Sequence, residues 1–348
     1  MTDRSVDRWL IRLSDPDGYS QLPSQRLDVS QIQPLLVLSE EHGVTGAVLS
    51  NLRRLVDREG WARLFRTPAT AADRNGVASA IDAANRRWFA AVAMTLCLRE
   101  RTVDLLPALR HERFPAALIK GEDFTDRLYG QPSLRPFRDI DLMMPRDVID
   151  ATTPVMTRLG YRFVRPGGKY DDCYGERTWD SLSQPRSRVE LHWNLINCPS
   201  QRRRSSLAFE ELQWEDAPAD GRPMLRVTPA SMLLIASVHA VVSHRFDRLQ
   251  HLCDIRQICR GIAGEVDFEW LREAATRNGN ASALTGALAV AERLLQEPAC
   301  ESALQRLRLP VARTAWRCLV SGGSLLHPES RLNKLRRTTM REWIKRAA

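Results

Sequence analysis

Two aspartates one residue apart inside an apolar run restrict the fold of this chain more than any other feature. The run is Asp139-Ile140-Asp141-Leu142. In a β-strand, alternate side chains point to opposite faces, so the two aspartates share one face while Ile140 and Leu142 enter a core. Carboxylates side by side repel each other unless positive charge lies between them. The pattern therefore predicts a strand that holds a cation, and hard oxygen ligands suit Mg²⁺.

A glycine turn precedes this strand. The apolar run 115–119 indicates a first strand, Lys120-Gly121 follows it, and a helix is predicted over 122–129. Backbone N–H groups at such a turn and at the start of a helix bind phosphate oxygens. We therefore expect Gly121 and Lys120 to contact phosphates. The alternative is that Lys120 is only a solvated residue at a strand end.

A third acid lies on a later alternating segment, 188–193 (RVELHW). Glu190 and His192 share one face of this predicted strand. If strand 187–195 lies beside strand 137–144, Glu190 joins Asp139 and Asp141. Three carboxylates on adjacent strands can hold two metal ions that bridge a triphosphate and stabilise an in-line displacement.

Each of these residues has an alternative interpretation. The two aspartates could form surface ion pairs with Arg135 and Arg138. Glu190 could lie on a solvated strand face, and His192 could be a structural histidine beside Trp193. Without metal, the sequence predicts mutual repulsion of the aspartates, so that neither carboxylate stabilises the metal-free fold.

The hydrophobic periodicity changes twice along the chain. Helical patterns cover 30–56, with a break at His42-Gly43, and 71–112. Strands and short helices follow, among them a helix over 147–158, a turn at 166–168 and a strand near 172–180. Helices return from Thr228 and include one near 302–320. This order predicts an α+β fold, a small mixed β-sheet flanked by N-terminal and C-terminal helical regions. The predicted units are residues 1–112, the N-terminal helical region; 113–227, the sheet-containing core; and 228–348, the C-terminal helical domain.

Composition narrows the class of protein. The chain has 348 residues and a net charge of +9, and only four of its basic residues are lysines. A positive balance fits polyanionic partners such as nucleotide phosphates or nucleic acid, although arginine preference can also reflect coding bias. No apolar run is long enough to span a membrane, and the N-terminus has no apolar signal region. The seven scattered cysteines form no CxxC pair, so we expect a cytoplasmic protein without a zinc-cysteine site or disulfide framework.

The ordered motifs resemble the uncharacterised nucleotidyltransferase family of the polymerase-β-like superfamily. That superfamily shows a hydrophobic residue, a Gly-Gly or Gly-Ser turn, an Asp-hydrophobic-Asp pair and an acid on a later strand. In this chain Ile119, Lys120-Gly121, 138–142 (RDIDL) and 189–193 (VELHW) stand in those places. The resemblance extends over roughly residues 30 to 295 and includes further motifs at Tyr129, Arg135, 159–161 (LGY), 239–244 and 252–254.

The resemblance implies a nucleotidyltransferase core that uses an NTP with Mg²⁺ or Mn²⁺. Asp139 and Asp141 would hold both metal ions, and Glu190 would complete the catalytic metal site and accept the acceptor's proton. The predicted phosphate ligands are Lys120, Gly121, Arg135, Arg138 and His192. Relatives imply varied acceptors, and we expect a peptide, small molecule or saccharide rather than RNA.

One departure from the superfamily affects the predicted activity. Gly121-Glu122 replaces Gly-Ser, which removes a phosphate contact and introduces a carboxylate that would repel phosphate if it faced the site. Two alternatives to nucleotidyl transfer follow: phosphoryl transfer on the same scaffold, or a catalytically inactive NTP-binding accessory module. Retention of all three acids favours the enzyme.

Two further segments have functional and structural interpretations. His239, His244, His251 and Asp254 lie at helical spacings, which fits either a metal site or polar helix packing; the second is the commoner use of such residues. The basic segment 331–346 is amphipathic as a helix, with Leu332, Leu335 and Trp343 near one side. It could bind an anionic membrane or nucleic acid, but we expect it to pack on the domain or fray as a terminal tail.

Overall fold

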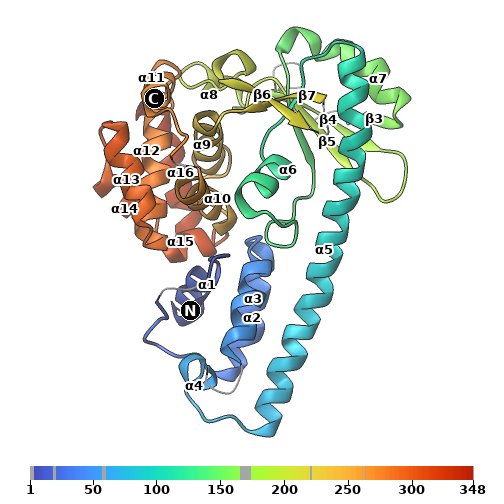
Figure 1. Ribbon diagram of the computed structural model, residues 1–348. Helices are drawn as coiled ribbons and strands as arrows, with labels where there is room; N and C mark the ends of the chain where they lie inside the picture. Colours follow the sequence, from blue (N-terminus) through green and yellow to red (C-terminus); the bar gives the residue numbers. More distant parts are fainter. Residues whose placement is uncertain are drawn as a thin grey trace.

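A mixed sheet with helical regions before and after it in the chain forms the protein, which confirms the predicted α+β fold (Figure 1). The computed structural model describes residues 4–18, 21–56, 60–164, 174–219, 222–262 and 264–347. The turn predicted at Pro166-Gly167-Gly168 lies outside the described residues. No helix among the described residues is long and apolar enough to cross a bilayer.

The N-terminal region is helical, as predicted. Gly43 adopts a φ of 70° between the second and third helices, a left-handed conformation that glycine accepts without strain and that ends a helix. The first helix was not predicted, because its sequence is mostly polar. The helices are α1 (Arg4–Leu13), η1 (Val29–Gln31), α2 (Ile32–Glu41), α3 (Thr45–Leu55), α4 (Trp61–Leu64) and α5 (Ala71–His111).

Helix α5 connects two hydrophobic cores. Its first part contributes Val77, Ile81 and Ala84 to a core shared with α1–α3 and the C-terminal helices. Its second part contributes Leu98 and Leu105 to a separate core beneath the sheet. Figure 1 shows α5 running from the N-terminal helices to the sheet. The sheet is therefore anchored to the N-terminal region through one continuous helix.

The sheet has seven strands in the order β3-β4-β5-β2-β1-β7-β6. The β2–β5 and β1–β7 pairs are parallel, and the β1–β2, β3–β4, β4–β5 and β6–β7 pairs are antiparallel. The strands are β1 (Ala117–Leu118), β2 (Ile140–Met143), β3 (Tyr161–Val164), β4 (Glu176–Ser181), β5 (Arg188–His192), β6 (Trp214–Ala219) and β7 (Arg222–Val227). One face of β2 and β5 packs Ile140, Leu142, Val189 and Leu191 into the core with α5.

The hairpin of β6 and β7 was not predicted. Prolines 218 and 223 interrupt its alternation, and proline within a sheet is confined to edges and bulges. The Asp220-Gly221 pair between the two runs is a hairpin signal that could have revealed it. The hairpin extends the sheet beyond β1, because β7 pairs with β1 in parallel.

Several predicted helices are shorter or less regular than expected. The helix predicted over 122–129 is α6 (Gly121–Phe124) followed by a π-helical turn, η2 (Thr125–Tyr129). The helix predicted over 147–158 begins as two 3₁₀ turns, η3 (Arg146–Val148) and η4 (Asp150–Thr152), before α7 (Thr153–Arg158).

The C-terminal part is helical from Pro229, as predicted. The helix predicted over 302–320 is divided near Pro310, which cannot continue an α-helix. The elements of this part are α9 (Pro229–Val238), η6 (His239–Ser243), α10 (Leu249–Gly261), α11 (Phe268–Arg277), α12 (Ala281–Leu295), α13 (Pro298–Leu307), α14 (Arg313–Leu319), α15 (Gly322–Leu326) and α16 (Arg331–Ala347). Two short helices, α8 (Pro199–Arg202) and η5 (Phe209–Glu211), lie earlier in the chain, between β5 and β6.

The final helix packs on the domain through its second half. Met340 is buried in the large core, and the Trp343 ring lies 4.8 Å from that of Trp316 in an edge-on arrangement. Leu332 and Leu335 are exposed, so they do not form the common buried side with Trp343 that the helical pattern indicated.

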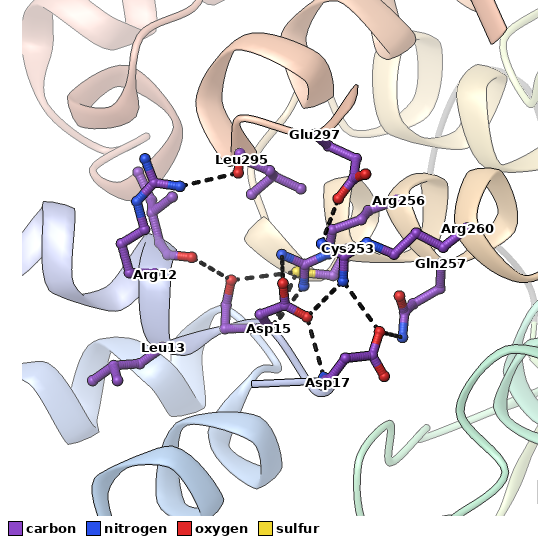
Figure 2. A network of polar contacts seen from close by, with 12 residues as sticks. Arg12, Leu13, Asp15, Asp17, Cys253, Arg256, Gln257, Arg260, Leu295 and Glu297 are labelled. Atoms are coloured by element: carbon purple, nitrogen blue, oxygen red, sulfur yellow. Dashed lines mark hydrogen bonds and ion pairs between the residues drawn. The ribbon is translucent and has the colours of Figure 1, made fainter. Parts of the chain in front are cut away.

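The N-terminal helices and the C-terminal helices share one hydrophobic core. The three-unit division at 1–112, 113–227 and 228–348 stays a prediction, and the shared core means that the first and third units are packed together. Polar contacts reinforce this packing where the loop after α1 meets α10 (Figure 2).

Arg256 and Arg260 of α10 lie at the centre of these polar contacts (Figure 2). The Arg256 side chain is 2% exposed; its Nη1 lies 3.4 Å from Asp15 Oδ2, and its Nη2 donates to the Ser14 carbonyl oxygen at 2.9 Å. Arg260 contacts Asp15 at 2.9 Å, Asp17 at 3.1 Å and Glu297 at 2.5 Å. Asp15 therefore neutralises a buried guanidinium as well as a half-exposed one.

Asp15→Ala should destabilise the protein much more than Asp17→Ala. Removing Asp15 leaves the Arg256 guanidinium buried without its carboxylate, which costs on the order of 3 kcal/mol. Asp17 is 63% exposed, and its removal should cost about 0.5 kcal/mol or less. Urea unfolding of both variants measures the difference. Equal free energies of unfolding would show that Asp15 does not stabilise Arg256.

Candidate functional site

Parallel pairing of β2 with β5 places two of the predicted acids side by side. Asp141 is opposite Glu190, and Met143 is opposite His192. This pairing confirms the prediction that strand 187–195 lies beside strand 137–144. Asp139 immediately precedes β2, and its pKa is raised, mainly by the negative charge of Asp141 and then by burial. The three predicted acids therefore lie in one cluster on the sheet face opposite the α5 core.

Asp141 is paired with a buried lysine. Lys120 Nζ lies 2.8 Å from Asp141 Oδ1, and Lys120 is 6% exposed. Burial favours neutral forms of both groups, but the pairing outweighs it: the pKa of Lys120 is raised, and Lys120 together with His192 lowers the pKa of Asp141 to about 2. Lys120 is therefore not the solvated residue of the alternative interpretation. The alternative ion pairs of the two aspartates with Arg135 and Arg138 are not found among the described residues.

Glu190 lacks such compensation. Burial, followed by the negative charges of Asp141 and Glu176, raises the pKa of Glu190 to about 7. Its Oε2 lies 3.6 Å from His192 Nε2, too far for a good hydrogen bond. Glu190 therefore keeps its proton more readily than an exposed glutamate does, and additional positive charge in the site would favour its ionised form.

His192 lies between three carboxylates. Its Nε2 lies 2.9 Å from Asp141 Oδ1, and its Nδ1 lies 3.2 Å from Glu176 Oε2 on β4. Burial and Lys120 oppose its protonation, but Asp141 and Glu176 outweigh them and raise its pKa. Nδ1 is buried and makes no well-aligned hydrogen bond. His192 thus links Asp141 and Glu176. Its role as a phosphate ligand stays a prediction.

Glu176 is the residue of this cluster that the sequence analysis missed. It is opposite His192 in the antiparallel β4–β5 pair, and Thr178 is opposite Glu190. Asn197 Nδ2 donates to Glu176 Oε2 at 2.8 Å and orients the carboxylate. The alternation of the segment near 172–180 was the available signal, but only the strand order places Glu176 beside His192.

The donor set fits a divalent cation. Asp139, Asp141, Glu176 and Glu190 bring four carboxylates to the cluster, whereas the cationic groups beside them are Lys120 and a protonatable His192. Ligand atoms of Asp141, Glu190 and His192 lie within 4.8 Å of one another. Oxygen ligands in this number suit Mg²⁺ or Mn²⁺. A metal at Asp141 would compete with Lys120 for the same carboxylate oxygen.

The Lys120-Gly121 turn has an unusual backbone. Lys120 has φ 62° and ψ −142°, and Gly121 has φ 31°. A positive φ is uncommon for a residue with a side chain and is found where surrounding contacts enforce it. The amide of Ile119 donates to the Asp141 carbonyl oxygen at 3.1 Å. This pairing brings the lysine directly to the aspartates.

Arg135 is hydrogen-bonded to this turn. Its Nη1 donates to the Gly121 carbonyl oxygen at 3.0 Å, while Nε and Nη2 bond to Asp254 of α10 at 2.7 and 2.9 Å. Tyr129 Oη donates to the same Asp254 at 2.9 Å. The sequence analysis predicted a phosphate ligand at Arg135, but its buried guanidinium is already bonded within the protein. These contacts hold the turn in place, and the phosphate role of Arg135 stays a prediction.

The other two charged residues near the turn point to different surroundings. Arg138 is exposed and stays a candidate for phosphate contact. Glu122 Oε1 lies 3.9 Å from Arg99 Nε on α5, and burial raises its pKa to about 6, while a hydrogen bond with Thr102 of α5 lowers it. Glu122 therefore faces α5, which answers the concern that it would repel phosphate from within the site.

Comparison with known proteins identifies a family whose model matches most of the chain. A family model described as an uncharacterised nucleotidyltransferase matches residues 28–296. No curated protein matches the chain significantly. Among solved structures, the chain is similar to an antigenic nucleotidyltransferase-like protein from Paracoccidioides brasiliensis, with 18% identity, a TM-score of 0.37, and coverage of 59% of this chain and 91% of that one. At that TM-score the structural similarity carries no argument.

Glu190→Gln should stabilise the metal-free protein above pH 7 and not below pH 4.5. The raised pKa of Glu190 means that the folded protein keeps a proton which the unfolded chain releases, so wild-type stability falls as pH rises from 4.5 to about 7. The gain should be on the order of 1–3 kcal/mol. Thermal unfolding in chelator across this pH range measures it. Glu269→Gln, at a 79% exposed site, is the control and should show no such pH trend.

Asp141→Asn should destabilise the metal-free protein, while Asp139→Asn should leave it unchanged or more stable. The sequence analysis expected no stabilising contribution from either aspartate; in the structure, however, the Asp141 carboxylate neutralises buried Lys120. Loss of one partner of a buried pair costs on the order of 3 kcal/mol. Denaturant unfolding in chelator distinguishes the two variants. The double variant Asp141→Asn with Lys120→Met should recover part of the loss; no recovery would show that the pair is not its cause.

Proposed function

Because the chain belongs to the uncharacterised nucleotidyltransferase family, we propose that it transfers a nucleotidyl group from an NTP to an acceptor with the help of Mg²⁺ or Mn²⁺. An acceptor hydroxyl or phosphate oxygen forms a bond to the α-phosphorus, and the bond from that phosphorus to the bridging oxygen breaks. Pyrophosphate leaves, and the acceptor's proton passes to a base. The observation that carries this proposal is the parallel register that sets Asp141 opposite Glu190.

The residues of the cluster take distinct roles in this proposal. Asp139, Asp141 and Glu190 would hold the metal, which supplies positive charge to the triphosphate and to the attacking oxygen. Glu190, with a pKa of about 7, is suited to accept the acceptor's proton near neutral pH. His192 and Glu176 keep the carboxylates oriented.

Lys120 is the buried cation closest to the acids and is the proposed phosphate contact at the turn. Its pairing with Asp141 at 2.8 Å keeps the charge inside the site before substrate binds. Gly121, which has no Cβ, permits the turn that brings the chain back into α6. The acceptor is proposed to be a peptide, small molecule or saccharide rather than RNA.

The Lys120–Asp141 pair also favours a second candidate function. In a non-catalytic NTP-binding module, Lys120 would take the place of a metal ion beside Asp141. In that case the chain binds NTP and releases no pyrophosphate. Glu190 favours the enzyme. Its pKa is raised by burial and by neighbouring carboxylates, as expected if Lys120 does not neutralise the negative charge of the whole cluster.

Turnover should depend on Glu190 and Asp139. The chain is incubated with each NTP, Mg²⁺ or Mn²⁺ and candidate acceptors; pyrophosphate release and the mass of the product are measured. Glu190→Gln should lower the rate at saturating NTP by about 100-fold or more, with a smaller change in NTP affinity, and Asp139→Asn should lower both.

The control is Asp180→Asn, which removes a carboxylate of β4 that pairs at the surface with Arg188. This variant should keep wild-type turnover. Full turnover in Glu190→Gln would overturn the assignment of the site. NTP binding by calorimetry without any pyrophosphate would favour the accessory module.

A further inference from the structure

Three histidines from two different elements come together in the C-terminal region. His239 begins the π-helical turn η6, His244 directly follows it, and His251 lies in the first turn of α10. Their ring centroids are 4.3, 4.8 and 4.5 Å apart for the pairs 239–244, 239–251 and 244–251. One ring nitrogen from each lies within 4.8 Å of the other two. We call these three residues the histidine cluster.

The backbone is shaped to bring two of these residues together. In an α-helix, residues five apart are about 140° apart around the axis. The wider turn η6, in which the His244 amide donates to the His239 carbonyl oxygen at 3.1 Å, reduces this separation. Arg245 and Phe246 follow with φ values of 51° and 55°. Such π-turns and left-handed residues are concentrated at functional sites.

The cluster has an orienting carboxylate and an unsatisfied nitrogen. His244 Nδ1 lies 3.1 Å from Asp247 Oδ1, and Arg337 Nη2 lies 3.4 Å from Asp247 Oδ2 and donates to the His244 carbonyl oxygen at 2.8 Å. A histidine whose Nδ1–H bonds to a carboxylate presents its Nε2 lone pair to a metal. His251 is 7% exposed, and its buried Nδ1 has no hydrogen-bond partner and lies 3.9 Å from Asp247 Oδ1.

An ion can reach the cluster from solvent. His239 and His244 keep some contact with solvent, which provides access for an ion.

We propose that the histidine cluster binds one divalent transition-metal ion, of which zinc is the best match. Three imidazoles prefer zinc and its neighbours over Mg²⁺. Three protein ligands leave one position of a tetrahedral ion open to water or to a substrate oxygen, as in catalytic rather than structural zinc sites. Asp254, which the sequence analysis grouped with these histidines, belongs instead to the ion pair with Arg135.

The site is separate from the carboxylate cluster but close to it. Ser243 Oγ of η6 donates to the carbonyl oxygen of Leu195, just beyond β5, at 3.4 Å. The histidine cluster therefore lies near the end of the strand that carries Glu190 and His192. The proposal does not depend on nucleotidyl transfer, because zinc binding is measured without turnover.

The competing explanation is that the three rings only pack together. Two of the three contacts are edge-on, with interplanar angles of 62° and 76°, which is a favourable arrangement for aromatic rings. Packing alone predicts no stoichiometric ion and leaves His251 Nδ1 unsatisfied. Measurement of metal binding decides between the two.

The test is zinc titration of the full chain, freed of metal by chelator, against a chromophoric competitor in excess Mg²⁺. The wild type should bind one Zn²⁺ per chain and gain thermal stability on binding. His244→Ala and His251→Gln should each weaken zinc binding by about 100-fold or more, and Asp247→Asn by about 10- to 100-fold. Bound Co²⁺ should show a visible spectrum that these variants lose.

Two control variants complete the design. His111→Ala removes an exposed histidine far along the chain at the end of α5, and Glu190→Gln alters the carboxylate cluster; both should keep wild-type zinc affinity. Circular dichroism in chelator checks that each variant is folded. His244→Ala is expected to be tolerated best, because the His244 side chain is 33% exposed. Wild-type affinity in folded His244→Ala, absence of stoichiometric zinc, or a loss confined to Glu190→Gln would each overturn the proposal.

Discussion

The buried ion pair between Arg135 and Asp254 holds the sheet to the C-terminal helices. Arg135 lies in the loop before β2, and Asp254 lies in α10. Through Nη1 the same guanidinium bonds the Gly121 carbonyl oxygen, so one side chain fixes both the turn and the approach to the aspartates. Hydrogen bonds to charged groups are stronger than neutral ones, and breaking a buried pair leaves an uncompensated charge. The geometry of the site therefore depends on where α10 lies.

Helix α10 has a comparable role at three positions along its length. Near its start it carries His251 of the histidine cluster, in its middle Asp254 receives Arg135, and further on Arg256 and Arg260 hold the loop after α1 (Figure 2). Its apolar side chains meanwhile lie in the core shared by the N-terminal and C-terminal helices. A shift of this helix would move elements of both candidate sites together.

The carboxylate cluster itself is electrostatically unbalanced. Lys120 compensates Asp141, whereas the pKa values of Glu190 and Asp139 are raised by burial and by neighbouring carboxylates. A fold that only required stability would replace such acids by neutral residues, because buried like charges lower stability. Accumulated negative charge on two adjacent parallel strands is instead compatible with the binding of divalent cations.

The sequence alone determined most of the local elements and three of the four acids of the cluster, Asp139, Asp141 and Glu190. Alternation placed Asp139 with Asp141 and Glu190 with His192, since side-chain direction in a strand depends only on residue spacing. It could not determine what Lys120 and Arg135 contact, because an isolated basic residue is equally compatible with solvent, phosphate or a buried partner. Glu176 lies beside His192 because of the strand order, and Arg135 forms an ion pair with Asp254 because of the way α10 packs. The gathering of three histidines likewise required the π-turn and the approach of α10, because contacts between distant segments are set by packing rather than by local periodicity.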